Sequence, residues 1–372
     1  MAEPLVAGEP AKHRRLELLD VLRFAAALLV VGYHWLFNGI DNGKVLSLDF
    51  TVVAPLFVYG SFGVHLFFLI SGFVISQSAR GKSAGAFVVS RGVRLFPAYW
   101  VAMLCTTIVV TVWANADLKV TPLQFLANLT MAPSLFGQSP VDGVYWTLML
   151  ELSFYAAVFL VLLCGWGRYL DRIFPIWGMA MLIIAVGAPS IAHLPYLGGY
   201  YAFFAAGAVM ATIQQRGFSA YRVAGLLASI AVAIEFVVRS LESFNAVRAF
   251  DSELIPTIAL VLSFFALVAL LWIPRVAHAR IPLSRPISDL TYPVYLLHAH
   301  IGYTVLNRLA TNDNVWLVYA GMLITLAAAS LAMHWIVEVR LRDVWFKAFS
   351  LLRHPVDALQ SRITRRPALN RA

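Results

Sequence analysis

Charged side chains are scarce in this sequence. Asp, Glu, Lys and Arg make up 13% of the 372 residues, and hydrophobic residues make up 60%. An average soluble domain carries about twice that charged fraction, so an ordinary soluble fold is excluded. Apolar runs of about 20 residues recur along the chain, and each is long enough to cross a bilayer as a helix. The composition therefore predicts an all-α polytopic membrane protein.

Cysteine is almost absent. Cys105 and Cys164 both fall in apolar runs, too few for a disulfide framework or a zinc site, and we expect them to be packing residues. The sequence also has no Gly-rich phosphate loop, no metal-ligand spacing and no Ser-His-Asp order, so no metal is expected. It shows no internal repeat, which counts against a secondary transporter.

The apolar runs predict about ten transmembrane helices. They lie at about 17–37, 56–76, 96–114, 145–164, 173–191, 197–214, 221–238, 254–273, 290–309 and 315–337. If the N-terminus is cytoplasmic, 22 of the 28 Lys and Arg fall in cytoplasmic segments and 5 in outer loops. The positive-inside rule then places both termini in the cytoplasm. The formal net charge of +9 follows from this topology, and no nucleic-acid binding is expected.

Three parts follow along the chain. We expect residues 1–16 to form a cytoplasmic N-terminal segment that is followed by an uncleaved first helix, because the sequence shows no small-residue cleavage site there. Residues 17–337 form the transmembrane domain, in which the longest outer loop, 115–144, contains a short helical turn at "PLQFLANLT". Residues 338–372 form a basic cytoplasmic tail, in which "VWFKAFSLL" predicts a helix lying on the membrane surface.

Ionisable residues inside the first span need an explanation. "LDVLRFAAALLVVGYHW" carries Arg23 and His34 eleven residues apart, which places them on one helix face about 16 Å apart. Each charge inside a bilayer costs several kcal/mol unless it faces protein or water. Asp20 is spaced to pair with Arg23. Alternatively, Arg23 reaches the inner headgroups and His34 bonds a neighbouring helix, with no chemistry involved.

The second and third spans add further candidates. "GVHLFFLISGFVIS" places His65 in mid-membrane, as a core histidine or a ligand, and "SGF" predicts close helix packing. In "SRGVRLFPAYW", Arg91 and Arg94 are spaced to face one way and can bind a phosphate bidentately. A plain positive-inside anchor is the alternative. We expect Pro97 in the first turn of the third span.

Two later spans carry the remaining polar residues. "YWTLMLELSFY" buries Glu151 below the outer surface, and an intramembrane carboxylate is a functional candidate by default. "TYPVYLLH" places Tyr292, Tyr295 and His298 along one helix face. An aromatic belt explains tyrosines at helix ends but not the histidine.

These motifs together resemble the acyltransferase-3 family of integral membrane acyltransferases, which O-acetylate bacterial surface polysaccharides, Nod factors and macrolides. The matching pieces are "LDVLRFAAALLVVGYH", "GVHLFFLISGFVIS", "SRGVRLFPAYW", "YWTLMLELSFY" and "TYPVYLLH". Each is weak alone, but the five occur in the family's order over residues 19–298. The resemblance implies a multi-pass protein of the bacterial cytoplasmic (inner) membrane.

The resemblance also implies an acyl-CoA donor, usually acetyl-CoA, entering from the cytoplasm, and a carbohydrate or glycoconjugate acceptor. It implies that His34 is the catalytic histidine and that Arg23, Arg91 and Arg94 are important, here for binding the donor. One departure is His65, where many members carry an acidic residue. The bilayer is the other expected partner.

As a hypothesis, the donor's phosphates lie at the arginines and its thioester near His34, which acts as a general base or takes the acyl group itself. Glu151 would then orient the imidazole, as a carboxylate does in a Ser-His-Asp arrangement. His298 would be a further catalytic residue, and it and Tyr295 would line the acceptor path or donate to the oxyanion.

We expect His65, Tyr292 and Tyr295 to contact the acceptor. The alternative function is a proton-coupled transporter or flippase, in which His34, His65 and Glu151 form a proton relay. That reading does not account for the arginine pair. The identity of the acceptor is not encoded in any motif of the chain.

Overall fold

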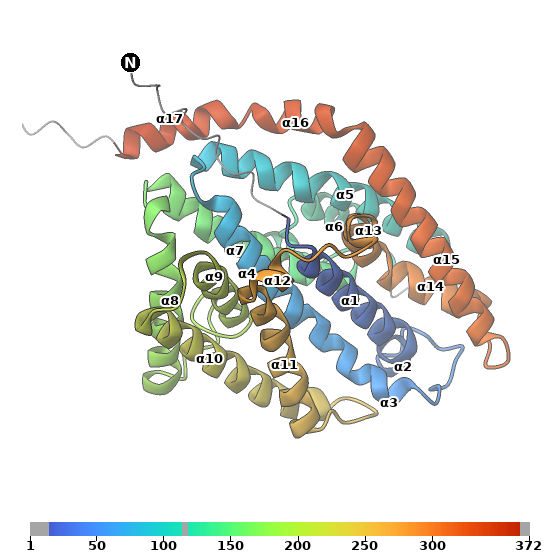
Figure 1. Ribbon diagram of the computed structural model, residues 1–372. Helices are drawn as coiled ribbons and strands as arrows, with labels where there is room; N and C mark the ends of the chain where they lie inside the picture. Colours follow the sequence, from blue (N-terminus) through green and yellow to red (C-terminus); the bar gives the residue numbers. More distant parts are fainter. Residues whose placement is uncertain (1–14, 114–117, 365–372) are drawn as a thin grey trace, which may run out of the picture.

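The computed structural model describes residues 15–113 and 118–364, which form helices joined by turns and loops, without a strand among them (Figure 1). The longer helices are α1 (Glu17–Tyr33), α4 (Gly63–Ala79), α5 (Ala84–Trp113), α7 (Trp146–Leu163), α8 (Leu170–Gly187), α9 (Tyr201–Arg216), α10 (Ala220–Asn245), α11 (Leu254–Ala269), α13 (Ser284–Leu297), α14 (Ala299–Leu309) and α15 (Val315–Met333). The shorter ones are α2 (Gly39–Asp41), α3 (Ala54–Phe57), α6 (Pro122–Asn128), α12 (Pro274–Ala277), α16 (Arg342–Ser350) and α17 (Arg353–Thr364).

Eight helical stretches among the described residues are long and apolar enough to cross a membrane. They match eight of the ten expected spans. The other two, 197–214 and 290–309, form α9, which has only 16 residues, and the pair α13 and α14, which is interrupted at His298. The all-α membrane class is confirmed, although two expected spans are shorter or broken. The cytoplasmic placement of the termini stays a prediction, and residues 1–14 and 365–372 of the terminal segments lie outside the described residues.

Three helices, α1, α4 and α13, lie at the centre of the molecule and position the candidate site. α1 packs against α4 and α13, and α4 packs closely against α9 (Figure 1). Glycines allow the close approach of α4 and α9, because a Cβ at Gly72 would lie 2.0 Å from the Phe204 carbonyl oxygen and one at Gly207 would lie 1.9 Å from that of Leu69. The small-residue surface predicted from "SGF" is therefore confirmed.

Two groups of helices flank this centre. α8, α9 and α10 pack together on one side, and α5 lies on the other (Figure 1). The tail helices α16 and α17 run along α5, where the Gly85 N–H donates to the Asp357 carboxylate at 2.9 Å. A helix is present at "VWFKAFSLL" as expected, and it packs on α5; its placement on the membrane surface stays a prediction. The capping box of Thr121 and Gln124 starts α6, where a short helical turn was expected.

Three local expectations are wrong. Pro97 lies in the interior of α5, because the helix begins at Ala84 and includes both expected phosphate-binding arginines. Asp20 does not pair with Arg23; it binds Arg15 at 2.5 Å and accepts from Ser288. Cys164 is exposed at the end of α7 and does not pack in the core.

Candidate active site

A cavity of about 370 Å³ lies between α1, α4, α5, α7 and α13. We call it the arginine cavity, because all three arginines expected to bind a donor line it. Its polar lining residues are Arg23, Ser71, Ser90, Arg91, Arg94, Thr147, Glu151, Tyr155, Ser288, Thr291, Tyr292 and Tyr295. Among the described residues that line it, Glu151 is the one carboxylate, so the charged side chains of the cavity favour an anionic ligand.

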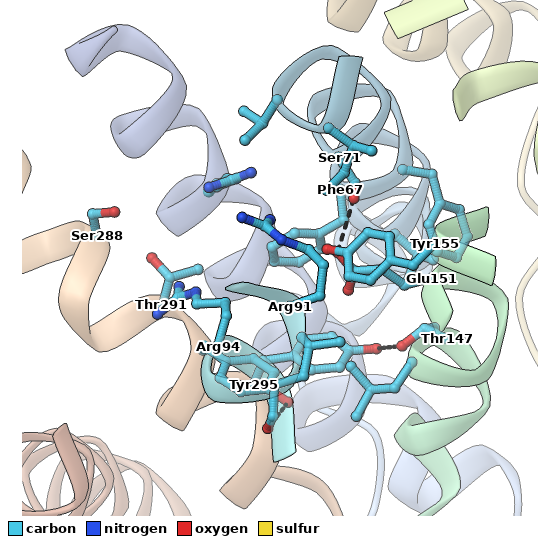
Figure 2. Close-up of a pocket in the computed structure, with 18 of the residues that line it drawn as sticks. Phe67, Ser71, Arg91, Arg94, Thr147, Glu151, Tyr155, Ser288, Thr291 and Tyr295 are labelled. Atoms are coloured by element: carbon cyan, nitrogen blue, oxygen red, sulfur yellow. Dashed lines mark hydrogen bonds between the residues drawn. The ribbon is translucent and has the colours of Figure 1, made fainter. Parts of the chain in front are cut away.

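The arginines keep much of their hydrogen-bonding capacity free. Arg91 contacts the hydroxyl of Ser90 at 3.0 Å, and its Nε has no partner among the described residues. Arg94 lies 3.4 Å from the Glu338 carboxylate, at the outer limit of a hydrogen bond. Arg23 has no carboxylate within 4.0 Å in the part of the chain that the structure describes. Figure 2 shows Arg91 and Arg94 close together in this cavity, where several guanidinium donors are available to a phosphate.

Glu151 belongs to the arginine cavity and does not orient His34. Its carboxylate accepts from the Ser71 hydroxyl at 2.8 Å and from the Tyr155 hydroxyl (Figure 2). Neither of these hydrogen bonds involves His34, so the expectation that Glu151 orients the imidazole is wrong. The reason is its position along α7. The start of this helix lies nearer the histidines, and Glu151 lies one helical turn further along, beyond Thr147.

The two tyrosines of α13 occupy different positions. Tyr295 is buried and its hydroxyl lies 2.7 Å from that of Thr147. The Tyr292 hydroxyl donates to the Leu95 carbonyl of α5 at 3.0 Å. Tyr292 lines the arginine cavity alone, whereas Tyr295 lines both cavities, because Tyr292 lies almost one turn closer to the start of α13. Its expected contact with the acceptor stays a prediction.

A second cavity, of about 350 Å³, lies further along α1. We call it the histidine cavity, because His34 and His65 line it. Its other polar and aromatic lining residues are Tyr33, Asn38, Lys44, Ser61, Trp146, Tyr200, Phe244, Arg248, Tyr295, His300 and Tyr303. Val64 and Tyr295 line both cavities. The two chambers therefore adjoin at Val64 of α4 and Tyr295 of α13, and α1 contributes Arg23 to one and His34 to the other.

His34 sits where α1 changes its winding. The α-helix ends at Tyr33, and His34 starts a π-helical turn that ends at Asn38, a distortion common at functional sites. Nδ1 of His34 lies 2.8 Å from the Val30 carbonyl oxygen and 3.1 Å from Nε2 of His298. The structure thus brings together two histidines that are 264 residues apart in the chain.

The hydrogen bonds assign the protons of this pair. Nδ1 of His298 lies 2.8 Å from the Tyr295 carbonyl oxygen, so in the neutral ring Nδ1 carries the proton and Nε2 is an acceptor. His34 then donates from Nδ1, because both neighbours of that atom, the Val30 oxygen and Nε2 of His298, are acceptors. The lone pair of His34 Nε2 is left for a ligand in the histidine cavity, as a general base requires.

The chain positions His298 by breaking a helix. Between α13 and α14 the N–H of His300 donates to Asp142 at 2.9 Å and not to the Leu296 carbonyl four residues earlier. The hydroxyl of Tyr145 donates to that Leu296 carbonyl at 3.1 Å. Irregular backbone at membrane depth is tolerated where protein groups satisfy it. The turn at 142–145 therefore holds the helix open at the histidine.

His65 lies apart from the histidine pair. It is 4% exposed, packs against the rings of Tyr200 and Phe203, and its Nδ1 has no partner among the described residues. No hydrogen bond within the described ranges joins His34, His65 and Glu151. The contacts of these residues thus give no support to a proton relay.

Four residues of the histidine cavity region were missed from the sequence. Lys44, Asp142, Arg248 and His300 lie in loops or at a helix end, where polar residues are common and no periodicity selects them. Charge is the sequence signal that could have identified two of them, because Lys44 and Arg248 are among only five basic residues assigned to outer loops. Both line the histidine cavity.

The fold and the adjoining cavities define a polytopic helical membrane protein with a polar site enclosed between its helices. The chain matches the model of the acyltransferase domain of the acyltransferase-3 family over residues 16–334. The protein therefore belongs to that family, as its motifs indicated.

Two relatives share part of the sequence. Nodulation protein 10 of Rhizobium leguminosarum bv. viciae is 33% identical over 160 residues, which cover 37% of this chain and 41% of that protein. Exopolysaccharide production protein ExoZ of Rhizobium meliloti (strain 1021) is 32% identical over 106 residues, 27% of this chain and 33% of that protein. The chain thus spans less than half the length of each relative. No solved structure matches it.

Proposed function

We propose that this protein is a membrane-embedded O-acyltransferase. It moves an acyl group, acetyl by family habit, from cytoplasmic acyl-CoA to a hydroxyl of a carbohydrate or glycoconjugate at the outer side of the bacterial inner membrane. The name of one relative, an exopolysaccharide production protein, favours a glycan acceptor.

One observation carries this proposal: an arginine-lined cavity and a histidine-lined cavity share Val64 and Tyr295, and α1 contributes Arg23 to the first and His34 to the second. The arginines of the first cavity suit the anionic nucleotide of a donor that also carries a long thioester arm. An acceptor hydroxyl needs a base, and the second cavity offers Nε2 of His34. The rise of α1 separates Arg23 from His34 by about 16 Å, a distance that an extended pantetheine arm can span.

The donor side uses charge. Arg23, Arg91 and Arg94 would bind the phosphates of acyl-CoA, because guanidinium groups match phosphate oxygens bidentately. The pantetheine arm would pass Val64 and Tyr295 on the way to His34. The carboxylate of Glu151 would accept hydrogen bonds from the amide groups of the arm. Glu151 thus acts on the donor in this proposal and not on the imidazole.

The chemical step needs one base. Nε2 of His34 takes the proton of the acceptor hydroxyl while its oxygen attacks the thioester carbonyl carbon. The carbon–sulfur bond then breaks, and the proton on His34 passes to the leaving thiolate. His298 accepts from the Nδ1–H of His34 at 3.1 Å, so it holds the ring in the required tautomer and supports its positive charge. The hydroxyl of Tyr295, which donates to the Val144 carbonyl at 3.2 Å, would exchange that acceptor for the oxyanion, and His65 lines the acceptor chamber.

The test is acyl-CoA turnover by the protein in reconstituted vesicles. His34→Ala should lower acyl transfer by about 10²–10⁴-fold, the usual contribution of a general base, and should leave donor binding intact. Arg91→Gln should weaken donor binding by about 10- to 100-fold, because it removes charge-assisted hydrogen bonds. The matched controls are His193→Ala and Arg239→Gln, two exposed side chains that line neither cavity.

Wild-type protein that neither binds nor consumes any acyl-CoA would contradict the proposal. Full activity in His34→Ala would also contradict it. A radiolabelled acyl group that stays on wild-type protein in the absence of acceptor, and not on His34→Ala, would select the two-step route through an acyl-enzyme. Proton-driven solute uptake by inactive wild type would favour a transporter.

A further inference from the structure

Two cationic side chains line the histidine cavity from separate loops. Lys44 follows α2, and Arg248 lies between α10 and α11. Both flank His34: Arg248 contacts Tyr33, whose ring is 4.9 Å from the His34 ring, and Lys44 lies over Tyr303, whose ring is 6.1 Å from it. The general base proposed above therefore shares its cavity with two positive charges.

Arg248 is held in place, but one of its hydrogen-bond donors has no partner among the described residues. Its Nη2 donates to the Tyr33 hydroxyl at 2.9 Å, and its guanidinium packs on the Phe244 ring at 4.8 Å. Its Nη1 is buried and has no hydrogen-bond partner among the described residues. No carboxylate in the described ranges lies within 4.0 Å of it. A buried guanidinium donor without a partner costs free energy, and an anion in the cavity would satisfy it.

The ammonium group of Lys44 also has hydrogen-bonding capacity that its contacts do not fill. Its ammonium group lies 3.4 Å from Nε2 of His300, an atom that also accepts from the Gly143 N–H at 3.2 Å. It lies 5.7 Å from the centre of the Tyr303 ring. Burial lowers the pKa of Lys44, and the charge of Asp142 opposes that shift. At least one N–H of the ammonium is therefore available to a ligand.

The acidic residues near this cavity are already engaged. No Asp or Glu is among its lining residues in the described part of the chain. Asp142 is fully buried and accepts from the backbone N–H groups of Val144 and His300. Asp41 accepts from the Ala249 N–H at 2.8 Å. Among the described residues, the wall of the cavity thus has two cations and no carboxylate.

Membrane topology gives no reason for these cations. Lys and Arg are depleted in outer loops, and this chain carries only five there by the predicted topology. Two of the five line one cavity of about 350 Å³, a size typical of small-molecule sites. A binding role explains this placement better than a topological one.

We propose that the acceptor carries an anionic group, a carboxylate, sulfate or phosphate, close to the hydroxyl that is acylated. Arg248 and Lys44 bind that anion, and the aromatic rings of the cavity pack against the sugar. This inference rests on the proposed acyltransferase function and specifies its acceptor class. The anion is either an acid group on the sugar itself or the phosphate of a lipid-linked glycan, since the same two cations suit both.

The experiment measures acyl transfer in vesicles to three acceptors. The first is a uronic-acid oligosaccharide, the second is the same oligosaccharide with its carboxyl groups reduced to alcohols, and the third is the reduced oligosaccharide linked to a polyprenyl diphosphate. Wild type should prefer an anionic acceptor over the reduced one by about 10- to 100-fold in kcat/KM, as a charge-assisted hydrogen bond implies. If wild type prefers the uronic-acid oligosaccharide, the anion lies on the sugar. If it prefers the oligosaccharide linked to polyprenyl diphosphate, the anion lies on the lipid carrier.

Variants separate binding from a general defect. Arg248→Gln and Lys44→Gln should each lower the anionic-to-neutral ratio by about tenfold, and Arg248→Lys should retain much of it. Arg239→Gln, in which the exposed partner of Glu235 is removed, should leave the ratio at the wild-type value.

Equal use of all three acceptors by wild type would overturn the inference. So would an equal loss on charged and neutral acceptors in Arg248→Gln and Lys44→Gln, because a structural defect does not depend on acceptor charge. Slow release of CoA without acceptor reports the proposed function separately. If that release is present and no charge preference exists, only the acceptor inference fails; if no donor is ever consumed, both fail.

Discussion

Replacing His298 by Phe tests the histidine pair directly. The substitution keeps a planar ring in the buried site but removes Nε2, which accepts from His34 at 3.1 Å, and Nδ1, which lies 2.8 Å from the Tyr295 carbonyl oxygen. His34 keeps its contact with Val30 at 2.8 Å. The imidazole therefore stays near its position and loses one of its two supports.

The expected loss follows from the charge that develops on His34. A hydrogen bond to a charged group contributes about 1.5–3 kcal/mol, and each 1.36 kcal/mol is about a tenfold change in rate. Acyl transfer should therefore fall by about 10- to 150-fold in His298→Phe. The loss should appear in kcat more than in the KM for the donor, because the arginine cavity is untouched.

The assay compares transfer rates of wild type, His298→Phe, His34→Ala and the double variant at saturating acyl-CoA. Groups that act as a unit are non-additive, so His298→Phe should cause little further loss when His34 is already Ala. His298→Gln retains an acceptor oxygen and should recover part of the rate. Thermal unfolding of each variant controls for a folding defect.

Two results would refute this reasoning. The first is a wild-type rate in folded His298→Phe, which would show that His34 needs no support from this ring. The second is the same fold-loss for His298→Phe in the wild-type and His34→Ala backgrounds. Additivity would mean that His298 contributes through the fold and not through His34.

Two further predictions concern the route past Val64 that we propose for the donor arm and the packing of α4 against α9. Val64→Phe should retain donor binding and lower transfer at least about tenfold by narrowing the passage beside Tyr295, since overpacking displaces neighbouring side chains; transfer at the wild-type rate would contradict a route past Val64. Gly207→Ala should destabilise the protein by about 1–3 kcal/mol, because its Cβ would lie 1.9 Å from the Leu69 carbonyl oxygen. Gly321→Ala is the control, since no atom lies within 4 Å of its Cβ, and equal thermal unfolding midpoints for the two variants would refute the packing argument.

Several features of the molecule could be predicted because they depend on local chemistry. The apolar runs predicted the helices, since backbone polar groups in a bilayer must be satisfied within each segment. The spacing of Arg91 and Arg94 predicted that they face one way, and both line the arginine cavity. The cost of ionisable groups in a membrane selected His34 and His298, which are in contact.

Other features depended on packing between distant segments. Glu151 was paired with His34 in the sequence interpretation, but hydroxyls from α4 and α7 hold it in the other cavity. α13 and α14 were expected as one span. The break at His298 arises because Asp142 takes the N–H of His300, and no pattern within 290–309 contains that partner.

The sequence by itself determined the membrane class, the family and the residue types available for chemistry, because composition, periodicity and motif order are properties of the chain alone. Only the tertiary structure decided which of those residues share a chamber. It separated Glu151 from His34, joined His34 to His298, and placed Lys44 and Arg248 in one cavity. The physical reason is that contacts between residues hundreds of positions apart are set by helix packing and loop closure, which local patterns do not record.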